Sequence, residues 1–240
     1  DLEQFQRQWT PVWREMFQLD ETTARIVEQP VYLRTLNNHT EEKLFLHRNN
    51  GGERIPVWLF TPKEKPGRWS VILIHPSGRG AFLERDSQHG ALIGALLDQN
   101  ISVLLLDKMP REDAVAAQRI VMAANYLKKK RRGTRVVGIG LESAGLSTFL
   151  AAPAFNAAML DGSFLNGEQK IPLQGLGAFG ELEVIGMLTA PAPLFLFNCP
   201  ETHTTEAIGS VYQLNSKGLF IRKKERLSDR EIADWVASLK

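Results

Sequence analysis

The spacing of apolar side chains near the start of the chain is typical of helix. Within residues 2–19 these side chains recur every three to four positions, which is the helical period: Leu2, Phe5, Trp9, Val12, Trp13, Met16 and Phe17. Thr10 before Pro11 is a typical helix start, so we expect two short helices or one broken helix. We expect residues 1–42 to form an N-terminal helical segment packed on the core.

From residue 43 the pattern changes to short strands that alternate with helices. KLFLHR (43–48) and RIPVWLFTP (54–62) flank an Asn-Asn-Gly-Gly turn signal, which predicts an antiparallel hairpin. Apolar runs predict further strands at 70–76, 101–107, 135–140, 157–162, 193–198 and 218–223. Helical patterns follow at 84–98, 112–130, from about 144, at 204–214 and from 228, where Ser228 and Glu231 make a capping box. We therefore predict one α/β domain over 43–240, with a mostly parallel sheet and helices on both faces.

Composition excludes several classes of partner. The formal net charge of the 240 residues is +2, which is too small to favour nucleic acid or a membrane surface. The basic run KKKRRG (128–133) complements the dipole at the end of a predicted helix; a site for a polyanion is the alternative interpretation. No apolar run is long enough for a membrane span. Cys199 is the single cysteine, so no internal disulfide forms.

Cofactor and metal motifs are missing from the sequence. GxGxxG does not occur in the frame that a dinucleotide site needs, and His75 and His89 do not have the spacing of a metal pair. We therefore expect no cofactor and no metal. Since the chain starts with Asp1, we expect a processed or trimmed N-terminus, which leaves the compartment unknown. The oligomeric state is also unknown.

Three segments carry a resemblance to a known family. IHPSGRG (74–80) follows one predicted strand, VLLLDKM (103–109) contains the end of the next, and GIGLESAG (138–145) is a strand-to-helix turn. With the hairpin ahead of them, they resemble the α/β-hydrolase superfamily, and are most similar to its dienelactone-hydrolase and acetyl-xylan-esterase-like branch. The resemblance implies activity on esters, an oxyanion-hole segment at 74–80 and a nucleophile elbow at 138–145.

The frame of the elbow points to Glu142 rather than to Ser143. An elbow needs small residues two positions before and two positions after the nucleophile, because larger side chains collide with the neighbouring strand and helix. Glu142 has Gly140 and Ala144 at these positions, whereas Ser143 would have Leu141 before it. We expect Glu142 at the nucleophile position, which leaves the Ser143 amide as an oxyanion donor. Ester hydrolysis ordinarily needs a hydroxyl or a thiol there.

The family's remaining triad residues do not match this sequence well. The segment after the last predicted strand, 221–232, contains no His, where the family keeps its catalytic histidine. The loop CPETH (199–203) offers Glu201 and His203, so Ser143, His203 and Glu201 form a candidate relocated triad. The alternative is that His203 is an ordinary solvated loop residue.

Four further residues are candidates for binding substrate. His75, Ser77 and Gly78 lie in the predicted oxyanion segment, where backbone amides and a glycine allow close approach of a ligand. Asp107 ends a strand at the carboxyl edge of the sheet, where open α/β sheets bind ligands. The alternatives are an ordinary loop at 75–78 and a capping or ion-pair role for Asp107.

Two functions follow from these residues. The first is an esterase-type hydrolase, acting on carboxylic or carbohydrate acyl esters with a degraded or relocated triad. The second is a non-catalytic α/β-hydrolase-like domain that binds a ligand or supports a larger hydrolase. Fold alone does not decide between them.

Overall fold

The computed structural model describes residues 1–16, 26–49, 52–64, 66–82, 90–165, 182–214 and 218–239. Its described strands form one sheet of nine, ordered β1-β2-β3-β5-β4-β6-β7-β8-β9. Their bounds are β1 (Ile26–Thr35), β2 (His39–Arg48), β3 (Ile55–Pro62), β4 (Trp69–Ile74), β5 (Ser102–Leu106), β6 (Arg135–Gly140), β7 (Ala157–Asp161), β8 (Leu194–Phe197) and β9 (Phe220–Arg222).

The sheet has an antiparallel part and a parallel part. The pairs β1–β2, β2–β3 and β3–β5 are antiparallel, whereas every pair from β5–β4 to β8–β9 is parallel. The predicted hairpin is confirmed as β2 and β3, in which Leu44 lies opposite Val57. The α/β class, the mostly parallel sheet and the N-terminal antiparallel strands are therefore as predicted.

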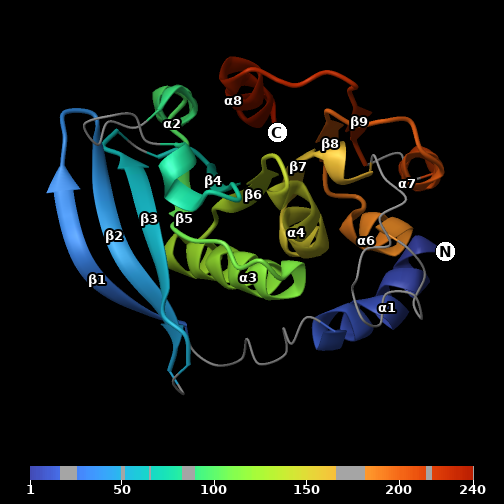
Figure 1. The fold of residues 1–240 in the computed structure, drawn as a ribbon, viewed down its shortest axis with the longest axis horizontal. Coiled ribbons are helices and arrows are strands. Elements are labelled where there is room, and N and C mark those ends of the chain that lie inside the picture. The colour runs from blue at the N-terminus through green and yellow to red at the C-terminus, as the bar shows by residue number, and fades with distance from the viewer. Residues whose placement is uncertain are drawn as a thin grey trace.

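Helices cover both faces of the sheet (Figure 1). They are α1 (Leu2–Met16), α2 (Ala91–Asp98), α3 (Asp113–Lys130), α4 (Ala144–Ala151), α6 (Leu182–Thr189), α7 (His203–Leu214) and α8 (Asp229–Ser238), with short 3-10 turns η2 (Gly78–Ala81), η3 (Ala152–Ala154) and η4 (Gly162–Leu165). The apolar cluster on one face includes Trp13 of α1, Ile120 of α3 and Phe149 of α4. The cluster on the other face includes Leu96 of α2 and Trp235 of α8.

The prediction of a helical segment over residues 1–42 is wrong for its second half. Residues 26–35 form β1, an edge strand of ten residues beside β2, and β2 itself begins at His39. The sequence IVEQPVYLRT contains β-branched and aromatic residues, which favour a strand. Pro30 argues against a strand at this position, because proline is rare inside sheets. An edge strand tolerates it, and the register shifts there, between Pro30 and Tyr32.

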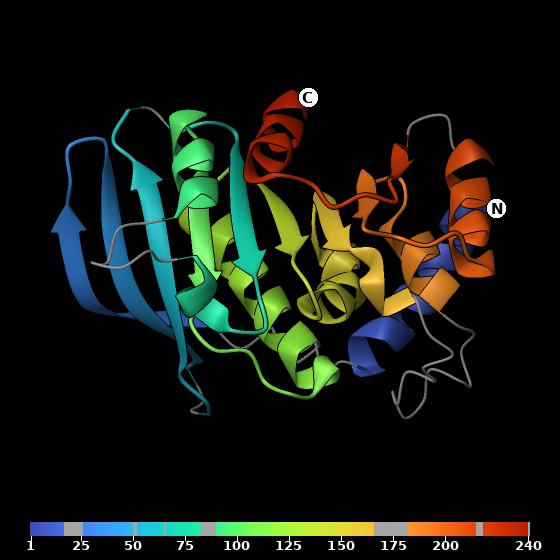
Figure 2. The same cartoon turned by 45° about the horizontal axis from the view of Figure 1, so that its top comes forward.

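The first half of that segment is helical and packs on the core, as expected. α1 is one helix that contains Pro11 rather than two helices. Its Trp13 is buried and donates an indole hydrogen bond to the Leu150 carbonyl oxygen at 2.9 Å. Figure 2 shows α1 behind the end of the sheet that carries β8 and β9.

Five of the remaining described helices, α2, α3, α4, α7 and α8, lie where helices were predicted, whereas α6 was not predicted. The start of the predicted helix at 84–98, including His89, lies outside the described residues, and α2 covers 91–98. The capping box of α8 is confirmed, since Ser228 accepts from the Glu231 amide while the Glu231 carboxylate accepts from the Ser228 amide. Among the described helices, none combines the length and the apolar character that a membrane span needs.

Candidate functional site

The candidate site lies at the carboxyl edge of the sheet, around β4. This strand pairs with β5 on one side and with β6 on the other. The helix that follows β4 packs on one face, and the helix that follows β6 packs on the opposite face. Ligands of open α/β sheets bind where neighbouring strands diverge in this way, because the two loops leave a crevice between them.

A sharp turn joins β6 to α4 at this edge. β6 ends at Gly140, the Leu141 amide donates to the Ile74 carbonyl oxygen at 2.9 Å, and α4 begins at Ala144. Glu142 has a φ of 52°, a left-handed conformation that costs a non-glycine residue about 1–2 kcal/mol. Ser143 has an ordinary helical φ of −64°. The strained residue of the turn is therefore Glu142.

Close packing between β6 and α4 explains why small residues flank this turn. A Cβ at Gly140 would lie 2.4 Å from Thr148 Oγ1, whereas the side chain of Leu141 packs against the core. A Cβ at Gly145 would lie 2.0 Å from the Asp161 carbonyl oxygen. The steric requirement before the turn thus falls on Gly140, two residues ahead of Glu142.

His75 and Glu142 meet across the edge of the sheet. His75 Nε2 lies 3.3 Å from Glu142 Oε2, and the two side chains are 14% and 55% exposed. His75 Nδ1 accepts a hydrogen bond from the Ser77 amide at 3.0 Å, so the neutral ring carries its proton on Nε2, facing the carboxylate. Sequence analysis gave His75 and Glu142 as separate candidate residues and did not predict their contact. Their positions after adjacent parallel strands were the available signal.

The predicted oxyanion segment uses its own amides internally. The Ser77 amide donates to His75 Nδ1, and the Gly78 amide donates to the His75 carbonyl oxygen at 2.8 Å. Gly78 has a φ of 59°, and a Cβ there would lie 2.0 Å from the Asp107 carbonyl oxygen. Only glycine therefore fits this position, and it holds the loop after β4 tightly against the loop after β5.

Asp107 takes part in an ion pair, which is the alternative to substrate binding that the sequence left open. Its Oδ1 lies 3.6 Å from Nε of Arg79, and the Arg79 guanidinium stacks 4.3 Å from the ring centroid of Trp58. The Arg79 amide also donates to the Asp107 carbonyl oxygen at 3.3 Å. Asp107 thus stands at the candidate site and is bound to the neighbouring loop.

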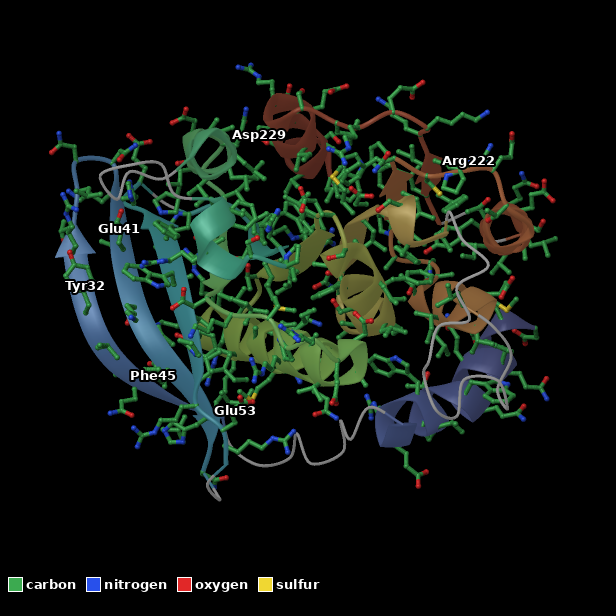
Figure 3. The ribbon with its side chains drawn as sticks, in the orientation of Figure 1. Tyr32, Glu41, Phe45, Glu53, Arg222 and Asp229 are labelled. Carbon is green, nitrogen blue, oxygen red and sulfur yellow. The ribbon has the colours of Figure 1, made fainter. Side chains whose placement is uncertain are left out.

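Glu201 is held away from a role beside Ser143. Its carboxylate pairs with Arg222, and with Lys224 at 3.5 Å. The Arg222 guanidinium, followed by the charge of Lys224, lowers the pKa of Glu201. The loop after β8 stands two strands from β6, a separation of about 10 Å at ordinary strand spacing. Arg222, the last residue of β9, is labelled in Figure 3 at the opposite end of the sheet from Tyr32.

His203 is the histidine of the candidate triad. α7 begins at His203, but its imidazole lies outside the described part of the structure. Ser143 is exposed at the start of α4, where it makes no side-chain capping hydrogen bond. Across the described ranges, no three His, Cys, Asp or Glu side chains converge in a manner that would hold a metal ion.

A buried carboxylate beside the elbow was missed by sequence reasoning. Asp161 ends β7 and is almost fully buried. Its Oδ1 accepts from the Ser163 amide at 2.9 Å and from Asn198 Nδ2 at 3.0 Å. Asn198 has a φ of 49°, so this carboxylate holds the strained start of the loop after β8. We interpret Asp161 as structural.

Comparison with known proteins gives similarity in structure alone. No protein-family profile matches the sequence, and no curated protein matches it. A candidate acetyl xylan esterase from Bacteroides fragilis is similar with a TM-score of 0.69 at 10% identity, over 98% of this chain and 77% of that one. A methylesterase gives 0.71 at 14% identity, over 99% of this chain and 63% of that one.

A third solved structure extends the comparison to a smaller enzyme. The dienelactone hydrolase from Anabaena variabilis has a TM-score of 0.51 at 14% identity, over 84% of this chain and 96% of that one. This chain therefore covers 96% of the dienelactone hydrolase but less than two thirds of the methylesterase. With the sheet order and the strained turn after β6, these similarities show that the chain has the α/β-hydrolase fold.

Proposed function

We propose that this chain is a non-catalytic module that keeps an esterase-type fold without serine-esterase chemistry. One observation carries the proposal: the strained residue of the turn after β6 is Glu142, whose carboxylate faces His75. An acyl-transfer enzyme needs a hydroxyl or thiol nucleophile at that point, activated by a base. The negative charge of Glu142 would also repel the oxyanion that develops on an ester carbonyl.

Two further features support the loss of catalysis. The amides of Ser77 and Gly78 are bonded within their own loop, so they are not aimed at a substrate oxygen. The segment after β9, residues 223–228, contains no His, although the fold usually keeps its base there. A site so arranged can bind a polar ligand at the carboxyl edge or support a neighbouring catalytic domain.

The second candidate function is hydrolysis of acyl esters by Ser143, His203 and Glu201. The observation in its favour is that the similar solved structures bear the names of esterases and a hydrolase. The ion pairs of Glu201 with Arg222 and Lys224 oppose it, because they occupy the carboxylate that would orient the histidine.

An assay on short acyl esters separates the two functions. We expect the wild-type protein to hydrolyse 4-nitrophenyl acetate no faster than Ser143→Ala and His203→Ala, after correction for the uncatalysed rate. Circular dichroism confirms that each variant is folded. Wild-type turnover that both substitutions abolish would establish the second candidate. Turnover that only Glu142→Ser abolishes would overturn both, and would assign the chemistry to Glu142.

A further inference from the structure

The amino edge of the central sheet, opposite the candidate site, gathers cations that no carboxylate of the described residues balances. Five basic side chains, here called the basic edge, come from the end of α3, the turn that follows it and the residue before β4: Arg68, Lys128, Lys129, Arg131 and Arg132. By contrast, Lys130 is balanced by Glu28 at 2.9 Å and by Glu42 at 3.0 Å. Within the described residues, no ion pair reaches the five others.

Arg131 is the half-buried centre of the basic edge. Its guanidinium donates to the hydroxyl oxygen of Ser102, and to that of Ser70 at 3.4 Å, and these serines face each other in register on β5 and β4. Both serines are fully buried, and the groups that accept from the positively charged Arg131 guanidinium are their neutral hydroxyls. Burial lowers the pKa of Arg131 because its charge is desolvated without a partner. An anion at this edge would supply the missing countercharge.

Hydrogen bonds hold the segments of the basic edge together. The Thr134 hydroxyl donates to the Arg68 carbonyl oxygen at 3.2 Å and accepts a hydrogen bond from the Ser70 hydroxyl at 2.9 Å. Lys128 reaches across to donate to the Ala154 carbonyl oxygen at 2.7 Å. The cations therefore stand on a fixed frame rather than on separate loops.

The positive charge at the basic edge is larger than the helix dipole of α3 needs for compensation. The C-terminus of α3 carries about half a negative charge from the helix dipole. Five cations exceed that roughly tenfold, so complementing the dipole does not explain them. Arg68, Lys129 and Arg132 are exposed, which leaves them available to a partner in solution.

Neutral polar groups lie among these cations. Asn156 is exposed just before β7, and because its Oδ1 accepts from the Val136 amide at 2.9 Å, its amide Nδ2 remains a donor. Thr134 is half-buried beside Arg68. Cations with the Asn156 amide donor and the Thr134 hydroxyl oxygen among them suit a ligand that carries carboxylates together with hydroxyls.

Other polyanions fit this edge less well. Trp69, the aromatic residue there, is buried and covered by Arg135, whose guanidinium lies 5.3 Å from the ring centroid, so it cannot stack on nucleic-acid bases. The large exposed apolar side chains of the described residues lie outside the basic edge: Val31, Tyr32, Leu33, Leu214 and Leu219. The basic edge therefore lacks an apolar anchor for a lipid surface.

We propose that the basic edge binds an acidic polysaccharide through the carboxylates of its uronate residues. The ligand lies on the side of the sheet opposite Glu142, so this binding is independent of the proposed function. It fits an architecture in which the module holds a polymer while chemistry occurs elsewhere.

Binding of polygalacturonate to the whole chain tests this inference, with neutral dextran, duplex DNA and phosphatidylserine vesicles as comparison ligands. We expect Lys129→Gln/Arg132→Gln to raise the Kd for polygalacturonate about tenfold at low salt, and to make its salt dependence shallower. Both residues are exposed, so the variant should fold as the wild type does.

The matched control removes two positive charges elsewhere, with Arg14→Gln/Arg226→Gln, two exposed residues on α1 and before α8. This control should leave the Kd within twofold of the wild-type value, and Glu142→Gln should do the same. Equal weakening by both double variants would reduce the effect to net charge and overturn the site. If polygalacturonate does not bind, the assignment to an acidic polysaccharide is overturned. Binding of DNA or vesicles as tight as that of polygalacturonate would overturn it too.

Discussion

Gly140, the last residue of β6, offers a sharp test of how the turn is packed. A Cβ at this position would lie 2.4 Å from Oγ1 and 2.6 Å from Cβ of Thr148 on α4. Carbon atoms in contact normally stand about 3.5–4.0 Å apart, so β6 and α4 would have to separate by about 1 Å. Thr148 cannot turn away freely, because it is fully buried and its hydroxyl donates to the Ala144 carbonyl oxygen at 2.7 Å.

We expect Gly140→Ala to lower the free energy of unfolding by about 3 kcal/mol, the upper end of the usual cost of overpacking a core. The expected cost is at the upper end of that range because the clash is with Thr148 Cβ and Oγ1, which lie close to the backbone of α4. For a chain of 240 residues, this loss corresponds to a fall in Tm of about 6–12 °C.

Urea unfolding followed by circular dichroism measures this change, and Gly80→Ala is the matched control. A Cβ at Gly80 meets no atom within 4 Å, so that substitution should change stability by less than about 0.5 kcal/mol. Thr148→Ala removes Oγ1 but keeps Cβ, so it should recover part of the loss when combined with Gly140→Ala. If Gly140→Ala alone stays within about 0.5 kcal/mol of the wild type, the close approach of β6 and α4 is refuted.

Two further predictions concern the capping of α8 and the single cysteine. Ser228→Ala removes the N-cap of α8 and should cost about 1 kcal/mol at pH 7. The amide and then the hydroxyl of Ser228 lower the pKa of Glu231 below its ordinary 4.5, so the stabilisation from these bonds to the carboxylate is present above that pH and is lost in acid. Ser228→Ala removes the hydroxyl's share of it, so the gap between variant and wild type should narrow from pH 7 to pH 3, and an equal gap at the two pH values would contradict this. Burial raises the pKa of Cys199 from 9.0 to about 11, so its native thiol should react with Ellman's reagent at pH 8 about 100-fold more slowly than in urea. Similar rates in the two states would show that this thiol is not protected.

Local pattern was enough to predict most elements of the fold. The apolar runs of β4, β5 and β6 are buried on both faces, as continuous runs in parallel sheets are. The turn after β6 was also readable, because its steric demands fall on residues next to each other in the chain. Glu142 has the positive φ that the sizes of Gly140 and Leu141 had indicated.

The local sequence pattern did not predict β1, because β1 is an edge strand. Pro30 is incompatible with a central strand, but it is tolerated in β1 because that strand pairs on one side only. Whether a strand stands at an edge depends on the pairing of the whole sheet. The sequence around Pro30 contains no local signal of it.

The sequence by itself determined the class of fold, the elements of its parallel sheet and the frame of the turn at Glu142, because these follow from side-chain size and apolar period among near neighbours. Only the tertiary structure decided which polar groups meet. His75 and Glu142 are far apart in the chain, yet they follow strands paired in one register. Arg131 meets Ser70 and Ser102 because α3 returns to the amino edge of those strands. Such contacts depend on register and on the direction of each side chain, which hydrophobic pattern does not encode.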